Sequence, residues 1–131
     1  MKKRIVSIIL ISLITLFLSA CEVNYDTHVD VAVAEFYTTK KASLSFKVLS
    51  SKKEYTLVSP NDISTLKYEV ELEEGSATAY IDYGNQKEEL FKINGGEKKD
   101  SSFTIKEKGT FTITIEPDGK MKKGKFVFEV K

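Results

Sequence analysis

The chain has 131 residues, with 20 basic and 19 acidic side chains, one histidine, one cysteine and a formal net charge of +1. A nucleic-acid-binding domain usually carries a basic excess, so this balance argues against nucleic acid as a partner. A single cysteine also excludes a disulfide within the chain, so packing alone must stabilise the fold.

The first 20 residues have the order of a secretory signal peptide. Lys2, Lys3 and Arg4 form a basic start, and an uncharged apolar run follows from residue 5 to residue 20. This run contains serine and threonine and is shorter than the roughly 20 apolar residues that a membrane-spanning helix requires. We therefore expect residues 1–20 to be cleaved from an exported protein. Cleavage removes three of the 20 basic residues and none of the 19 acidic ones, which weakens the case for nucleic acid further.

Leu18-Ser19-Ala20-Cys21 ends this run and resembles the lipobox of bacterial lipoproteins at each of its four positions. The resemblance implies cleavage before Cys21, a diacylglycerol on the Cys21 thiol and often an acyl chain on the new amino terminus. It implies no cofactor beyond this covalent lipid. An ordinary signal peptide that happens to end beside a cysteine is the alternative.

The resemblance also implies a location in the cell. Residue 22 is Glu, where the family's inner-membrane retention signal in Gram-negative cells would be Asp. Attachment to the cell membrane or to an outer membrane, on the exported side, therefore stays open. Residues 21–26 are expected to be a lipidated tether, and at ~3.3 Å per extended residue they reach only about 20 Å. Residues 27–131 are expected to form one folded domain beside the membrane.

Apolar and polar residues alternate from residue 27 onward, which is typical of strands with one buried face. The clearest strand contains Leu66, Tyr68, Val70 and Leu72, with charged residues between them. KEYTLVS (53–59) and KEELFKI (87–93) predict strands with weaker alternation. Further alternating sets are Val29, Val31 and Val33; Leu44, Phe46 and Val48; Ala77, Ala79, Ile81 and Tyr83; Phe103 and Ile105; Phe111, Ile113 and Ile115; and Phe126, Phe128 and Val130. We expect the last set to be central to the core.

Turn-forming residues separate these runs, among them Glu74-Gly75-Ser76, Gly84-Asn85, Asn94-Gly95-Gly96 and Pro117-Asp118-Gly119. Glycine and asparagine accept positive φ, and proline presets the first turn position. Short strands with such turns predict an all-β fold, a single antiparallel β-sandwich of about 7–9 strands, either immunoglobulin-like or jelly-roll. A small closed barrel would show the same alternation.

Asp26, His28 and Asp30 form a D-x-H-x-D motif that would place three potential metal ligands on one face of a strand. Imidazole and carboxylate groups suit a divalent metal such as zinc. Same-face residues of one strand lie about 6.6–7 Å apart, so ligands from elsewhere would have to complete the site. A solvated strand edge is the alternative interpretation.

Two further groups are candidates for binding. Tyr80 and Asp82 are expected on the outer face of one strand, where a tyrosine can stack on a sugar or anchor an interface. Lys120, Lys122 and Lys123 belong to the densest lysine cluster, which could contact an anionic membrane or polymer. Both groups could equally be ordinary surface residues.

Acidic side chains form a third group, at Glu69, Glu71, Glu73 and Glu74. Carboxylates about 5–9 Å apart across a cleft can hydrolyse glycosides, and converging oxygens can bind calcium. We expect these residues on a convex outer face without a cleft, where they would serve solubility.

The sequence shows no recognised catalytic motif: no nucleophile elbow, no metalloprotease helix and no phosphate-binding glycine loop. It therefore predicts a non-enzymatic lipoprotein of the cell envelope, a binding or interaction module attached to membrane lipid through Cys21, with an envelope protein or glycan as partner. Two alternatives stay open. The chain could be an accessory structural subunit of an envelope complex, or a metal- or carboxylate-dependent hydrolase.

Overall fold

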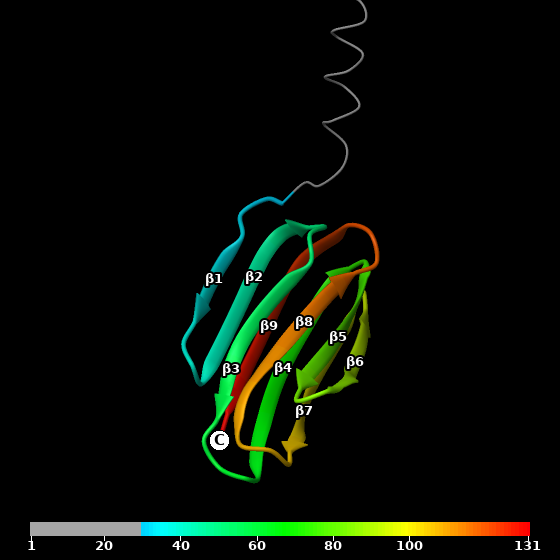
Figure 1. The fold of residues 1–131 in the computed structure, drawn as a ribbon. Helices are drawn as coiled ribbons and strands as arrows, with labels where there is room; N and C mark the ends of the chain where they lie inside the picture. Colours follow the sequence, from blue (N-terminus) through cyan, green and yellow to red (C-terminus); the bar gives the residue numbers. More distant parts are fainter. Residues whose placement is uncertain (1–29) are drawn as a thin grey trace, which may run out of the picture.

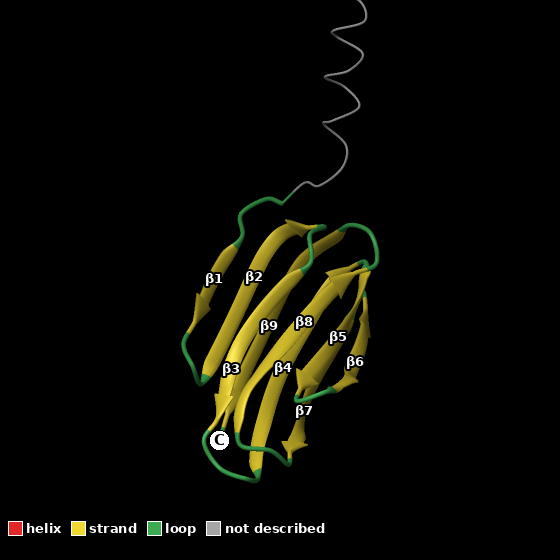
Figure 2. Ribbon diagram, viewed as in Figure 1, coloured by secondary structure: helices red, strands yellow, loops and turns green. Residues whose placement is uncertain are grey.

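The computed structural model describes residues 30–131, so Cys21, Asp26 and His28 lie outside the described residues. The described residues form nine strands (Figures 1 and 2). Residues 30–131 contain no helix with the length and hydrophobicity of a membrane span. The strands are β1 (Ala34–Tyr37), β2 (Lys41–Leu49), β3 (Lys53–Ser59), β4 (Ser64–Glu74), β5 (Ser76–Tyr83), β6 (Gln86–Asn94), β7 (Glu97–Ile105), β8 (Gly109–Pro117) and β9 (Met121–Val130).

The strands form two antiparallel sheets that pack face to face as a β-sandwich, which confirms the predicted fold class. Sheet A has the strand order β1-β2-β9-β4-β7, and sheet B has the order β3-β8-β5-β6. The pairs β2·β9, β3·β8, β4·β7 and β5·β6 are nested, as in one long antiparallel ribbon folded over on itself. This is the jelly-roll arrangement, so the jelly roll, and not the immunoglobulin-like order, is the sandwich that forms.

Strand β9 lies at the centre of sheet A, between β2 and β4 (Figure 1). Phe126 and Phe128 are 0% and 1% exposed, and Val130 is buried beside them, as the alternation predicts. In β4, residues on one side are buried and those on the other are exposed along nearly the whole strand. Alternating apolar side chains from both sheets therefore fill the space between them.

The first predicted strand is wrong in its position, and of its described valines only Val33 packs against the core. Val29 lies outside the described residues. Val31 forms only an isolated bridge to Val48, and β1 begins three residues later at Ala34. Ala32 between them has a positive φ of 52°, which breaks the pleat and with it the alternation. As a result β1 is a short edge strand whose four residues are all exposed, and Val31 is 42% exposed.

Candidate functional site

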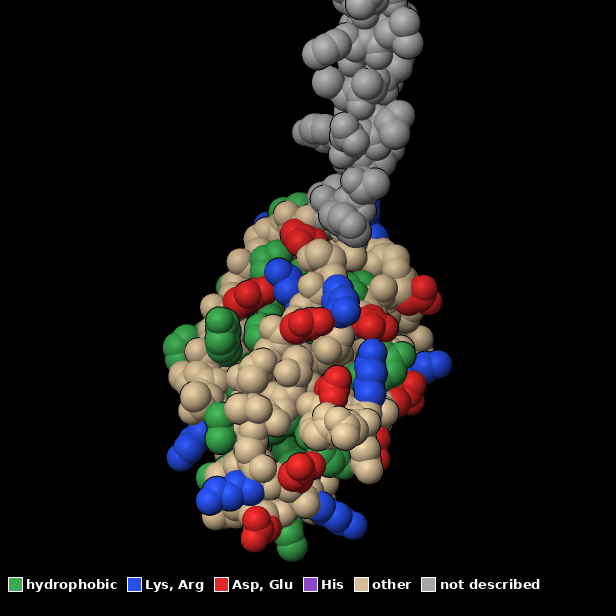
Figure 3. All heavy atoms as spheres, viewed as in Figure 1, with side chains coloured by type: hydrophobic (Ala, Val, Ile, Leu, Met, Phe, Trp, Pro, Cys, Tyr) green, Lys and Arg blue, Asp and Glu red, His purple; other side chains and the backbone are tan. Residues whose placement is uncertain are grey.

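Tyr80 and Asp82 lie on the outer face of sheet B, opposite the buried Ala79 and Ile81, as predicted. The Nζ atom of Lys87 lies 4.6 Å from the centre of the Tyr80 ring. This cation–π contact covers one face of the ring. On the side of the protein that Figure 3 shows, lysines and acids intermingle, and no large patch of one charge is visible. Tyr80 is therefore only partly available for stacking on a ligand.

The three candidate lysines lie where β8 ends and β9 begins. Lys122 Nζ is 3.8 Å from Glu74 Oε2, and Lys123 Nζ is 3.7 Å from Glu73 Oε2. Lys120 lies in the turn before them. Two of the three charges are thus partly compensated by carboxylates of β4. The structure does not bring these lysines together with the candidate pair on β5, which lies in the other sheet.

Asp30 is the one member of the D-x-H-x-D motif among the described residues. Its carboxylate accepts hydrogen bonds from the backbone N–H groups of Ser50 (3.1 Å) and Ser51 (3.3 Å) and from the Ser51 hydroxyl. The Ser51 hydroxyl is the main cause that lowers the pKa of Asp30. Asp30 therefore connects the segment before β1 to the β2–β3 loop through hydrogen bonds. Within residues 30–131 no group of three His, Cys, Asp or Glu could hold a metal ion. With Asp26 and His28 outside these residues, the metal site stays a prediction.

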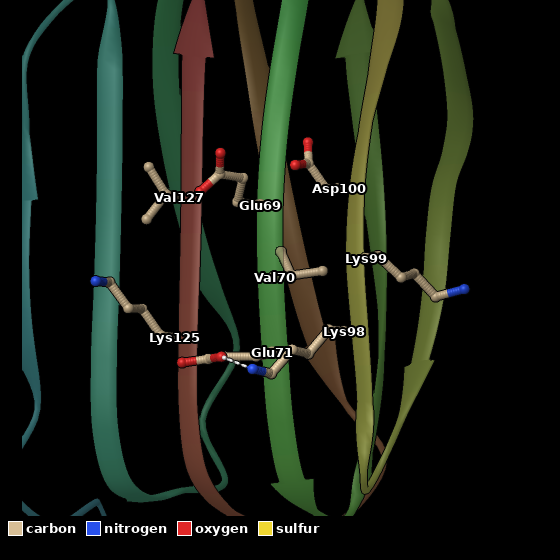
Figure 4. Close-up of a pocket in the computed structure, with 8 residues that line it drawn as sticks. All are labelled: Glu69, Val70, Glu71, Lys98, Lys99, Asp100, Lys125 and Val127. Carbon is tan, nitrogen blue, oxygen red and sulfur yellow. Dashed lines mark ion pairs between the residues drawn. The ribbon is translucent and has the colours of Figure 1, made fainter.

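An open hollow of about 380 Å³ lies on the outer face of sheet A, over β9, β4 and β7 (Figure 4). Its central row is Lys125, Glu71 and Lys98, because Glu71 is the register partner of Lys125 on one side and of Lys98 on the other. Lys98 Nζ lies 3.5 Å from Glu71 Oε2. Lys125 forms no ion pair with any described residue and reaches toward β2 (Figure 4).

The next row toward the carboxyl end of β9 contains Val127, Glu69 and Asp100. Asp100 has no ion-pair partner among residues 30–131, and Glu69 has only a distant one, Lys67 Nζ at 3.9 Å. The hollow thus combines unpaired charges of both signs with the apolar Val127.

A second hollow, of about 420 Å³, adjoins the first and shares Glu71, Lys98 and Lys125 with it. It extends toward the β4–β5 turn, where the Lys123–Glu73 ion pair lies. We call the two hollows together the trough. The side chains that line it from the outer face are Glu69, Glu71, Glu73, Lys98, Asp100, Lys123, Lys125 and Val127.

Small and apolar residues flank the trough on the side of β2 and β1. Ser45 is the register partner of Lys125, and Ser43 lies between Val127 and Phe36. The Phe36 side chain is 61% exposed. An aromatic ring and two serine positions therefore lie on the same face as the charged rows.

The trough corrects the expectation that the acidic face is convex and lacks a cleft. Glu69, Glu71 and Glu73 lie on the outer face as predicted, yet they line a hollow. The partners that complete it, Lys98 and Asp100, come from the polar first half of β7. This half of β7 has no alternating apolar residues, so the sequence did not predict that Lys98 and Asp100 would lie beside Glu71.

A polar cluster also lies at the edge of the sandwich, where β1 faces β3. Lys53 Nζ is 2.9 Å from Glu35 Oε1, and the rings of Tyr37 and Tyr55 have centroids 5.9 Å apart. Burial and then the nearby Glu35 carboxylate raise the pKa of Tyr55. The Tyr55 hydroxyl is buried and has no hydrogen-bond partner among the described residues. These contacts attach β1 to sheet B.

No protein-family description and no curated protein sequence matches the chain. Among solved structures, TmCBM61 in complex with β-1,4-galactotriose is similar with a TM-score of 0.46 and 18% identity, over 76% of this chain and 69% of that one. The periplasmic inhibitor of g-type lysozyme PliG, from Salmonella Typhimurium, has a TM-score of 0.43 and 14% identity, over 75% and 95% of the two chains. A CBM4 structure has a TM-score of 0.42 and 8% identity, over 82% of each chain. Likenesses at this level assign no function to the chain.

Proposed function

We propose that this chain is an exported, lipid-anchored binding module without catalytic activity, which holds a neutral glycan of the cell envelope in the trough on sheet A. The observation that carries the proposal is the composition of the trough. Four carboxylates and three ammonium groups line it in adjacent rows, beside Val127 and the flanking serines.

The mixed charges favour a hydroxyl-rich ligand. A sugar hydroxyl both donates and accepts hydrogen bonds, so it fits between a carboxylate and an ammonium group such as those of Glu71 and Lys125. The near balance of charge gives no strong field that would attract a polyanion. The exposed Phe36 ring can add an apolar contact at the edge of the same face.

Glu71 and Glu73, two of the four carboxylates of the trough, are poorly arranged for hydrolysis. Glycoside hydrolysis requires one carboxylic acid that donates a proton and a second, ionised carboxylate. Glu71 and Glu73 are instead ion-paired with Lys98 and Lys123. This arrangement supports a role in binding.

The trough predicts which substitutions weaken binding. Glu71→Gln and Lys125→Gln each remove a charged hydrogen-bonding group, which typically costs about 1.5–3 kcal/mol and corresponds to roughly tenfold or more in dissociation constant. Both variants should fold normally because the side chains are exposed. Calorimetric titration of the purified protein with a panel of neutral envelope glycans measures this loss.

Matched controls lie on the other sheet. Asp82→Asn and Lys92→Gln change the same kinds of exposed side chain on the outer face of sheet B. They should leave the dissociation constant unchanged. Equal losses in both sets, or a ligand that responds only to the sheet B variants, would contradict the trough assignment.

The lipid anchor is supported by the lipobox resemblance alone. Attachment through two or more acyl chains would be stable, since each buried methylene contributes about 0.8 kcal/mol. Residues 21–29 span at most about 30 Å at ~3.3 Å per residue, so the trough would work close to the membrane.

Replacing the lipidated residue tests this part of the proposal. We expect the wild-type protein to sediment with membranes and its mature form to begin with a lipid-modified Cys21, as measured by mass spectrometry. Cys21→Ser should leave an uncleaved or released protein without lipid. A wild-type protein that begins at Cys21 with a free thiol would instead indicate an ordinary signal peptide.

A further inference from the structure

The two edges of sheet A differ in their side chains. At one edge, β7 carries Lys98, Lys99 and Asp100, and charges of this kind discourage pairing with another strand. At the other edge, β1 and the residues before it carry three of the four large apolar side chains that are exposed in the described chain: Val31, Phe36 and Tyr37. The β1 edge therefore lacks the protection that the β7 edge has.

Strand β1 is held firmly enough to act as a template. Its inner side is attached to sheet B by the Glu35–Lys53 ion pair and by the contact between the Tyr37 and Tyr55 rings. All four of its residues pair with β2. The remaining edge of β1 faces away from the sandwich (Figure 1).

The hydrogen-bond pattern shows which backbone groups point outward. The N–H of Thr38 donates to the carbonyl of Lys41, so the backbone groups of Thr38 point toward β2. The N–H of Val130 donates to the carbonyl of Lys40, so Lys40 faces β9 and its neighbour Lys41 faces β1. Because backbone groups alternate in direction along an antiparallel strand, Phe36 faces β2 with its N–H and C=O. Those of Glu35 and Tyr37 point away from the sheet, where a further strand would bind.

We propose that a second copy of this chain pairs with that edge, β1 antiparallel to β1, about a two-fold axis that passes beside Phe36. Glu35 of each copy then exchanges two backbone hydrogen bonds with Tyr37 of the other. The two Phe36 side chains face each other as a non-hydrogen-bonded pair, on the outer side of the sheet. The two sheets A join into one sheet of ten strands.

This register follows from the side chains. A shift that placed Tyr37 opposite itself would pair Phe36 with Thr38 and leave its ring without an apolar partner. A shift that placed Glu35 opposite itself would set two like charges in contact, which destabilises a strand pair. Centring on Phe36 avoids both, and a self-complementary patch is what a two-fold interface requires.

The axis of such a pair is compatible with attachment to one membrane. It runs perpendicular to the joined sheet, so both copies present their outer faces, and their troughs, to the same side. The first described residues of the two copies lie at opposite ends of the strand pair, and residues 21–29 span at most about 30 Å from each of them to the lipid. Attachment to a common surface raises the effective concentration of the copies, which lets a short interface form. The pairing itself does not depend on the glycan proposal.

Cysteine crosslinking of the full chain in bacterial membranes tests the pairing. Opposed non-hydrogen-bonded residues have Cα atoms about 4.5 Å apart, which suits a disulfide. Under mild oxidation, Phe36→Cys should form a disulfide dimer of twice the chain's mass. Ile63→Cys is the control, because Ile63 is 69% exposed and lies in the β3–β4 loop. We expect Phe36→Cys to crosslink several-fold more than Ile63→Cys.

Neighbouring positions test the register. Glu35→Cys and Tyr37→Cys should each crosslink weakly alone and strongly when one copy carries the first and a tagged copy carries the second. Wild-type chain controls for any reaction of Cys21. Equal crosslinking at Phe36→Cys and Ile63→Cys, no dimer at all, or a product with a different protein would overturn the proposal. Strongest crosslinking of Glu35→Cys with itself would overturn the register.

Discussion

Phe126→Ala is expected to lower the free energy of unfolding by about 3–5 kcal/mol, the usual cost of truncating a buried phenylalanine. Phe126 is fully buried in the central strand of sheet A, and its ring centroid lies 6.1 Å from that of Phe46 and 6.3 Å from that of Phe91. It therefore joins two strands of sheet A to one of sheet B. Urea denaturation, followed by circular dichroism, measures the loss.

Ile63→Ala is the control, since it truncates a large apolar side chain that is 69% exposed and lies outside the proposed interface. Its effect should stay within about 0.5 kcal/mol, as is usual for surface substitutions. A cost at Phe126 as small as that at Ile63 would contradict the placement of β9 in the core.

Gly124→Ala is expected to destabilise the protein by about 1–3 kcal/mol, although it adds only one methyl group. A Cβ atom at Gly124 would lie 2.4 Å from Cζ of Phe46 and 3.0 Å from its Cε1 and Cε2. Phe46 is 6% exposed and has little room to move. The φ of Gly124 is not in the positive range, so the expected cost comes from this contact and not from backbone strain.

A double-mutant cycle separates these causes. Phe46→Ala removes the ring that occupies the space over Gly124, so Gly124→Ala should cost much less in that background than in the wild type. The coupling of two residues in direct contact is typically about 0.5–3 kcal/mol. Additive costs would mean that Gly124 is required for a reason other than the Phe46 ring.

The sequence predicted the parts of the fold that depend on local alternation. KEYTLVS corresponds to β3 from its first residue to its last, and the alternation around Tyr68 runs through β4 as predicted. Phe126 and Phe128 are central to the core, also as predicted. These succeed because a strand with one buried face must repeat its apolar residues every second position.

The failures lie at the two edges of sheet A. The alternating valines before β1 suggested a buried strand, but positive φ at Ala32 interrupts the pleat. The first half of β7, Glu97 to Asp100, gave no strand signal because an edge strand needs few apolar residues. The order of the strands in each sheet could not be predicted from the sequence either, because the same alternation fits several ways of folding the ribbon.

The trough could not be predicted for a related reason. Lys98, Glu71 and Lys125 are far apart in the chain and meet only because β7, β4 and β9 are neighbours in a particular register. The sequence predicted that Glu71 is an exposed acid, but it did not show which lysines lie beside it. The sequence analysis predicted binding residues from exposed tyrosines and dense lysine clusters instead. It therefore named Tyr80 and Lys120, Lys122 and Lys123 as candidates.

Footprinting of lysines by acylation, with and without envelope glycans, shows which outer face of the sandwich binds the ligand. Lysines on both outer faces are exposed, so the same reagent reports on both sheets in one experiment. A glycan bound in the trough should protect Lys98 and Lys125 while Lys87 and Lys92 react as before. Protection of Lys87 and Lys92 with Lys98 and Lys125 unchanged would contradict it and move the binding surface to sheet B.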